Sequence, residues 1–391
     1  MRHARWGRLG LLLVAGLLSG AGIASSRAED KSSGPASRQE STSPRIQLAI
    51  LLDTSNSMDG LINQARTQIW KIVNTLATAK RDGKSPDLQV ALYEYGKATL
   101  PKEQNFLRKI LPFTDDLDRI SEELFALTTN GGEEYCGAVI DAATRELDWT
   151  AGDTDLKLVY VCGNEPFTQG SIDYRKACEA AVKRGIIINT IFCGNESEGI
   201  RTGWKDGAQL ADGSFLTIDQ NRVVAEVKTP FDEDLNKLST AVNRTYVAFG
   251  RPADREGFKA RQEAQDKNAA AAAPAAGAER AAFKASAKYN NAAPDLVDGV
   301  ASGKVKLGEV KEDELPEELK SLKPEERPAY LEKKQAERKK IQDEIKSLSE
   351  KRSKFIAEER AKQAKSDAND SLDAALIKSI KDQAAKRKYE F

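Results

Sequence analysis

Between residues 45 and 250, short apolar runs alternate with segments in which apolar side chains recur every three or four positions. The first run, residues 46–52, is apolar except at Gln47, and its length is typical of a strand buried on both faces of a parallel sheet. After a polar loop, the apolar spacing in residues 60–80 predicts an amphipathic helix.

The same alternation continues along the chain and predicts further strands and helices. The strands are expected at residues 89–95, 107–111, 156–161, 186–192 and 214–218, and the helices at 117–127, 139–147, 174–184, 204–210 and 232–249. Strands that alternate with helices in this way indicate an α/β fold with a doubly wound, mostly parallel, Rossmann-like sheet that is covered by helices on both faces.

Beyond Gly250 the composition shifts to Ala, Lys, Glu, Gln and Arg. Residues 251–328 contain an Ala-rich stretch and then several prolines among charged residues, so we expect a linker and an irregular segment there. Residues 329–391 are a predicted helical C-terminal tail, with helices at 329–363 and 371–387.

The first tail helix carries a weak heptad pattern. Ile341, Ile345 and Leu348 approximate an apolar seam, which Arg352 interrupts before Phe355. Because the seam lasts less than three heptads, it indicates a coiled coil only weakly, and self-association through the tail is one expectation. The alternatives are a solvated, partly ordered helical tail and a helical hairpin or lid that packs back on the domain.

The N-terminus has the parts of a secretory signal peptide, predicted over residues 1–28. Positive charges precede an uncharged apolar run at 9–24, and residues 26–28 provide small side chains for cleavage. A membrane anchor is the less favoured alternative, because the run is short for a bilayer span. We therefore expect a disordered leader at 29–44 and a periplasmic or secreted protein without an integral membrane segment after signal cleavage.

Charge and histidine content exclude several kinds of function. Lys plus Arg and Asp plus Glu both number 60, so the net charge is zero and gives no general attraction to nucleic acid or anionic lipid. The only histidine, His3, lies in the predicted signal, which excludes Ser-His-Asp and Cys-His catalysis and His-ligated zinc in the mature chain. A general base would have to be Asp, Glu, Lys or Tyr.

Three loops are unusual in a fold whose ligands bind beyond the carboxyl ends of the strands. They are residues 53–58, 131–136 and 163–166. In the first loop, Asp53 provides negative charge, while Ser55 and Ser57 provide hydroxyls at alternate positions that can point the same way. Such oxygen ligands suit a hard cation such as Mg²⁺, and the alternative is that these residues cap the following helix.

Asp53, Ser55 and Ser57, which follow a buried strand, resemble the metal-ion-dependent adhesion site (MIDAS) of von Willebrand factor A-type (VWA) domains. The resemblance covers residues 45–250 and implies a doubly wound sheet with Mg²⁺ or Ca²⁺ bound at its top. In many members of the family, a Glu or Asp of a protein partner completes the metal shell. Together with the charged helical tail, the pattern is similar to a group of exported bacterial VWA-domain proteins, which adds no functional expectation of its own.

The chain departs from the family pattern in its other two loops. Glu133 stands where the family usually has Thr, and Gly163 stands where it usually has Asp. Either Glu133, Glu134 or Glu165 replaces the missing ligands, or the site has weakened. A direct Glu ligand would offset more of the charge of the cation and would favour coordination of the kind that Ca²⁺ adopts.

The chain has four cysteines. The resemblance makes the strands that end at Cys162 and Cys193 neighbours, so a disulfide between these two residues is a candidate in an oxidising compartment. Cys178 is more simply a buried apolar residue, and Cys136 could be free. The alternative is that all four are buried thiols, and a catalytic cysteine is least favoured because no histidine is present to activate it.

These observations favour a binding module that recognises an unknown protein partner through a divalent-metal site. One rival is a structural or scaffolding protein with a degenerate site. The other is a metal-dependent hydrolase that uses Glu133 or Glu165 as its base, which no motif requires. We therefore expect no enzymatic activity.

Overall fold

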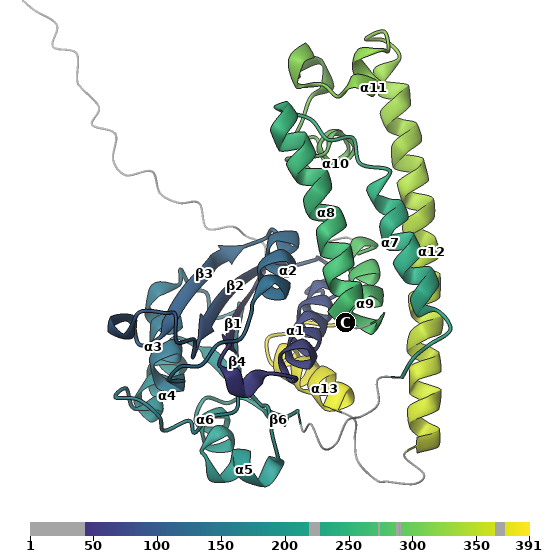
Figure 1. Cartoon of the computed structure of the whole chain (residues 1–391). Helices are drawn as coiled ribbons and strands as arrows, with labels where there is room; N and C mark the ends of the chain where they lie inside the picture. Colours follow the sequence, from purple (N-terminus) through teal and green to yellow (C-terminus); the bar gives the residue numbers. More distant parts are fainter. Residues whose placement is uncertain (1–43, 219–226, 273, 287–288, 290, 364–371) are drawn as a thin grey trace, which may run out of the picture. The chain divides into compact units, whose positions relative to one another are not determined.

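The computed structural model describes residues 44–218, 227–272, 274–286, 289, 291–363 and 372–391. The predicted signal peptide and leader lie outside the described residues, apart from Pro44. The strands are β1 (Arg45–Asp53), β2 (Asp87–Tyr95), β3 (Leu107–Thr114), β4 (Leu156–Gly163), β5 (Ile186–Phe192) and β6 (Phe215–Thr217). They form one sheet in the order β3-β2-β1-β4-β5-β6, in which only the β2–β3 pair is antiparallel (Figure 1). The predicted fold class is confirmed.

The central strand, β1, is buried on both faces, as its apolar run predicts. Ile46, Leu48 and Ile50 contribute to the core on one face of the sheet, whereas Ala49 and Leu51 contribute to the core on the other. β1 pairs in parallel with β2 on one side and β4 on the other. Because side chains alternate along a strand, a slip of one residue would exchange these two sets, so burial fixes the register.

Helices cover both faces of the sheet (Figure 1). On one face, side chains of α3 (Cys136–Glu146), α4 (Tyr174–Lys183) and α6 (Trp204–Leu210) complete the core. On the other, α1 (Ile62–Ala77), α2 (Leu117–Ala126) and α13 (Leu372–Ala385) do so. The three short helices beside these are η1 (Asn56–Met58), η2 (Lys102–Gln104) and α5 (Glu196–Arg201). The last helix of the chain thus belongs to the α/β unit.

The contacts of α13 show how the chain end closes the sheet. The side-chain amides of Gln383 and Asn189 on β5 bond to each other reciprocally, at 3.1 and 2.6 Å. Past the helix, the Tyr389 hydroxyl donates to the backbone oxygen of Arg45 at 2.8 Å, at the start of β1. The predicted domain boundary at Gly250 therefore falls too early, because the sheet is covered by a helix that lies far beyond it.

A second helical layer lies over α1 and α2, and it includes the predicted linker. Its main helices are α7 (Asp232–Asn243), α8 (Pro252–Ala272), α9 (Pro274–Lys284) and α12 (Arg327–Gln363), with the short α10 (Leu296–Ala301), η3 (Leu307–Glu309), η4 (Glu312–Glu314) and α11 (Glu317–Lys320). The linker prediction for 251–328 is corrected by α8 and α9. Alanine has the highest helix propensity, and Ala275, Ala278 and Ala281 are buried where α9 packs against its neighbours.

Helix α12 buries one residue in seven: Leu331, Arg338, Ile345 and Arg352. Arg352 does not interrupt the seam, because it forms ion pairs with Asp232 of α7 at 2.7 Å and Glu279 of α9 at 3.1 Å. The seam faces α7, α9 and α10 of the same chain. The face that we predicted for self-association is therefore occupied by the protein's own helices. Among the described residues, no helix is both long and apolar enough to cross a membrane.

We expect Ile380→Ala to lower the free energy of unfolding of the α/β unit by about 2–5 kcal/mol, because this side chain on α13 is fully buried in the core over α1. Ile377→Ala, at a 36% exposed position of the same helix, is the matched control and should change the value by about 0.5 kcal/mol or less. Urea unfolding followed by circular dichroism measures both. Equal effects of the two substitutions would show that α13 does not stabilise the sheet.

Candidate metal centre

The loop after β1 brings three oxygen-bearing side chains together. Asp53 is fully buried, and its Oδ1 accepts a hydrogen bond from the backbone N–H of Ser55 at 2.8 Å. The Ser55 and Ser57 hydroxyl oxygens lie 2.8 Å apart. The Ser57 hydroxyl also donates to Oδ1 of Asn164, which follows β4, at 2.9 Å. The structure thus brings the first and third of the unusual loops together.

The serines do not cap a helix, which was the alternative interpretation. Ser55 precedes η1, but its side chain makes no capping hydrogen bond. The residue before α1 is Leu61, which has no hydroxyl. Because capping requires a side-chain oxygen that accepts from a backbone N–H of the first turn, the two hydroxyls remain available for a ligand.

A buried carboxylate oxygen of Asp53 has no partner. Within the described residues, its Oδ2 has no hydrogen bond, although it is inaccessible to solvent. Burial raises the pKa of Asp53 to about 7, and the charge of Glu165 adds to the increase. An unpaired buried charge is costly, so the carboxyl group in this position is stable either when it is protonated or when a cation is bound to it.

Glu134, from the second loop, approaches the same position. Glu134 is buried, and its pKa is raised to about 7 by burial and by the charges of Asp53 and Glu165. Gly96 lies between the two carboxyl groups, because a Cβ built on it would be 2.7 Å from Asp53 Oδ1 and 2.8 Å from Glu134 Cγ. Only a residue without a side chain fits there, and the left-handed backbone at this position, with φ of +81°, also favours glycine.

The three glutamates proposed as substitute ligands are placed differently. Glu134 lies beside Asp53, and Glu165 is near enough for its charge to raise the pKa of both buried carboxyl groups. Glu133 is exposed, and the Tyr135 hydroxyl donates to it at 3.5 Å. The structure therefore brings Glu134 and Glu165 to the site and leaves Glu133 at its edge.

Residues that the sequence did not single out hold the loop in place. Thr54 donates through its hydroxyl to Glu94, which is buried in β2 and forms an ion pair with Arg108 of β3. The backbone N–H of Thr54 also donates to the Tyr95 oxygen at 2.9 Å. A glutamate within an apolar strand was the available signal, because such a residue requires a partner.

The donor set fits a hard divalent cation that takes oxygen ligands. Asp53 provides charge, the two serines provide hydroxyls, and Glu134 and Asn164 provide further oxygens at the same edge. In the part of the chain that the structure describes, no three His, Cys, Asp or Glu side chains are close enough to hold a metal by themselves. Hydroxyl, amide or backbone oxygens, or water, would therefore complete a cation shell here.

The sulfurs of Cys162 and Cys193 lie 3.5 Å apart and are buried, at the ends of the adjacent strands β4 and β5. The structure has them as thiols. The other two cysteines are separate: Cys136 contacts Tyr95, and Cys178 contacts the backbone of Gly207. Burial raises the pKa of both thiols, which disfavours the reactive thiolate.

No model of a known protein family matches the chain, and no curated protein matches it. The protein BatB from Bacteroides thetaiotaomicron is 18% identical, has a TM-score of 0.34 and covers 44% of this chain and 90% of its own. The VWA domain of SpRpn10 is 15% identical, with a TM-score of 0.35, and the match covers 45% of this chain and 88% of that domain. Proximal thread matrix protein 1 from the mussel byssus, with a zinc-occupied MIDAS motif, is 14% identical, with a TM-score of 0.34. The match covers 46% of this chain and 43% of that protein. These likenesses concern less than half of the chain and carry no inference about its activity.

In the cation-free protein, we expect Asp53→Asn to increase the free energy of unfolding near pH 8, by at most about 4 kcal/mol, and to change it much less near pH 5. The pKa of Asp53 is raised by folding from 3.8 to about 7, so the cost of the buried charge is fully present above pH 7, declines as the pH falls below that value, and is gone only below about pH 3.8. Urea unfolding in the presence of a chelator measures the difference.

Asp212→Asn, at an exposed carboxylate, is the control for this pH dependence. It removes the same charge without removing a buried one, so its effect should be small at both pH values. An Asp53→Asn effect that is equal near pH 5 and near pH 8 would contradict the assigned cost of the buried charge.

We expect mild oxidation to join Cys162 and Cys193, because their sulfurs need to approach by only about 1.5 Å to reach the S–S distance of about 2.05 Å. Thiol counting after unfolding should then find two fewer reactive thiols than in the reduced protein. Cys178→Ser should remove one thiol before and after oxidation without preventing the bond. A full thiol count after oxidation would contradict the disulfide.

Proposed function

We propose that this protein is an exported binding module of the VWA type, which recognises a protein partner through a divalent cation, Mg²⁺ or Ca²⁺, at the carboxyl end of its sheet. The observation that carries the proposal is the unpartnered, buried Oδ2 of Asp53 beside the paired hydroxyls of Ser55 and Ser57. A cation would be bound by that oxygen, and the two hydroxyl oxygens would serve as further ligands.

The carboxylates of the site favour Ca²⁺ over Mg²⁺ in this proposal. Asp53 and Glu134, when ionised, offset the double charge of the cation, and Glu165 adds further negative potential nearby. Ca²⁺ takes six to eight oxygen ligands in flexible geometry, whereas Mg²⁺ demands near-ideal octahedral geometry and keeps several waters. A cation whose charge is already offset also attracts an acidic group of a partner less strongly.

Export is part of the same proposal and rests on residues 1–28, whose charge and apolar pattern are those of a signal peptide. Export would also place the four cysteines in a compartment where a disulfide persists. The proposal includes no catalytic step, because neither the partner recognition nor the donor set requires one.

A scaffolding protein with a degenerate site is the second candidate. It is favoured by the substitution pattern of the loops, in which Gly163 stands at a usual ligand position, and by the lack of a group of three acidic or sulfur ligands among the described residues. In that case the two serine hydroxyls would serve only to bond to each other and to Asn164.

Calorimetric titration of the purified protein with Ca²⁺ and Mg²⁺ distinguishes the two candidates. We expect saturable binding, and we expect Ser55→Ala combined with Ser57→Ala to weaken it at least tenfold, which corresponds to about 1.4 kcal/mol for two lost oxygen ligands. Binding should also weaken as the pH falls below 7, because protons compete for Asp53 and Glu134.

Ser197→Ala, at an exposed serine outside the loop, is the matched control and should leave the affinity unchanged. A wild-type titration without heat at any cation concentration, checked by equilibrium dialysis, would reject the metal site and leave the scaffolding role. Binding that survives the double substitution would place the cation elsewhere.

A further inference from the structure

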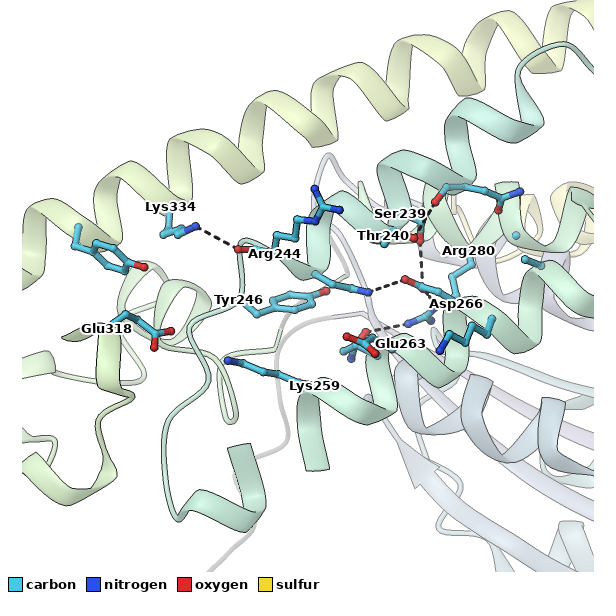
Figure 2. Close-up of a pocket in the computed structure, with 17 residues that line it drawn as sticks. Ser239, Thr240, Arg244, Tyr246, Lys259, Glu263, Asp266, Arg280, Glu318 and Lys334 are labelled. Carbon is cyan, nitrogen blue, oxygen red and sulfur yellow. Dashed lines mark hydrogen bonds and ion pairs between the residues drawn. The ribbon is translucent and has the colours of Figure 1, made fainter. Parts of the chain in front are cut away.

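The second helical layer contains a concavity of about 630 Å³ that includes none of the loop residues of the candidate metal centre. Its walls come mainly from α7, α8 and α9, and α12 passes along one side (Figure 2). Sites for small organic molecules usually measure about 300–1,000 Å³ and are largely formed before the ligand arrives. The size of the concavity therefore suits a small organic molecule rather than a single ion.

A buried ionic network holds these walls together. Arg280 of α9 bonds to Asp266 of α8 at 2.7 Å and to Asp118 of α2 at 3.1 Å. Lys284 of α9 also forms an ion pair with Asp266 at 2.7 Å, and the Ser239 hydroxyl of α7 donates to Asp266 at 3.2 Å. Satisfied buried networks of this kind fix helices in one arrangement, so the concavity is preformed. Its floor carries no net charge, because the two cations balance the two carboxylates.

The rim, in contrast, is positively charged. Arg244 follows the last turn of α7, Lys259 and Lys267 lie on α8, and all three are exposed and have no ion pair among the described residues. Lys334 of α12 also lies at the rim; its Nζ donates to the backbone oxygen of Arg244 at 3.2 Å and forms an ion pair with Glu337 of the same helix at 3.4 Å. Figure 2 shows Arg244, Lys259 and Lys334 among the side chains that line the concavity.

Two carboxylates oppose these cations. Glu263 and Glu318 also line the concavity, and neither forms an ion pair within the described residues. Taken over all lining residues, five side chains are cationic and three are anionic. Glu337, which does not line the concavity, offsets the charge of Lys334, and the lining keeps a net positive charge. A concave surface of one dominant sign concentrates its field and attracts counter-ions.

We propose that this concavity binds a small organic dianion, of the dicarboxylate or phosphate monoester class. The net positive charge of the lining favours an anion, and a second negative charge lets the ligand meet more than one of the cations that are unpaired within the described residues, Arg244, Lys259 and Lys267. The guanidinium of Arg244 can bond in bidentate fashion to either a carboxylate or a phosphate. Tyr330, which is half-buried, provides aromatic surface for the carbon skeleton of such a ligand. The site is independent of the cation at the sheet edge, so its test does not depend on the function proposed above.

Calorimetric titration of the full chain with glutarate and with glucose 6-phosphate tests this site, and inorganic phosphate serves as the comparison. We expect saturable binding of at least one of the two organic dianions, tighter than that of inorganic phosphate. Lys259→Met should weaken it about tenfold, whereas Glu263→Gln should tighten it several-fold, because it removes an opposing charge. Lys339→Met, at an exposed lysine of α12 outside the concavity, should leave the affinity unchanged.

The opposite signs expected for Lys259→Met and Glu263→Gln separate the proposal from a folding defect, which would weaken binding in both variants. The probe that binds decides between a dicarboxylate and a phosphate monoester. Binding of neither organic probe in the millimolar range would overturn the proposal. Equal affinities of Lys259→Met and Lys339→Met would also overturn it, because the anion would then be bound elsewhere.

Discussion

The burial of β1 on both faces is the constraint on which the rest of the structure depends. A strand between two parallel neighbours has no freedom to slide, so its last residue, Asp53, is delivered to one point at the edge of the sheet. The same burial removes water from that carboxylate. Its charge must therefore be met by a proton or by a cation, and the surrounding hydroxyls and Glu134 determine which cation can do so.

The closure of the sheet by the end of the chain is the second constraint. The core face shared by α1 and β6 is covered by α13, which follows β6 only after the whole second helical layer. The chain must therefore leave the α/β unit and return to it. As a result, the helices that line the concavity lie in sequence between two parts of the α/β unit, β6 and α13. The described part of the chain is one compact unit.

Local patterns were sufficient to predict the sheet and part of the site. The strands at the centre of the sheet are compact, mostly apolar runs, and Asp53, Ser55 and Ser57 lie at and just after the end of the first. Whether Glu133 or Glu134 reaches the site depends on how the second loop packs against Gly96, and no local sequence pattern predicts that packing. The position of α13 was equally out of reach, because its contacts join residues about two hundred positions apart.

The second layer was misjudged because its contacts replace apolar burial with buried ion pairs. Arg352 and Arg338 lie at heptad positions of α12 that an apolar side chain would normally hold, and each meets two carboxylates of the same chain. In a parallel two-stranded coiled coil, equivalent positions face each other, so these arginines would oppose their own copies without a partner. The buried charges thus favour packing within the chain over self-association. In the sequence alone, the same arginines look like interruptions of the heptad pattern.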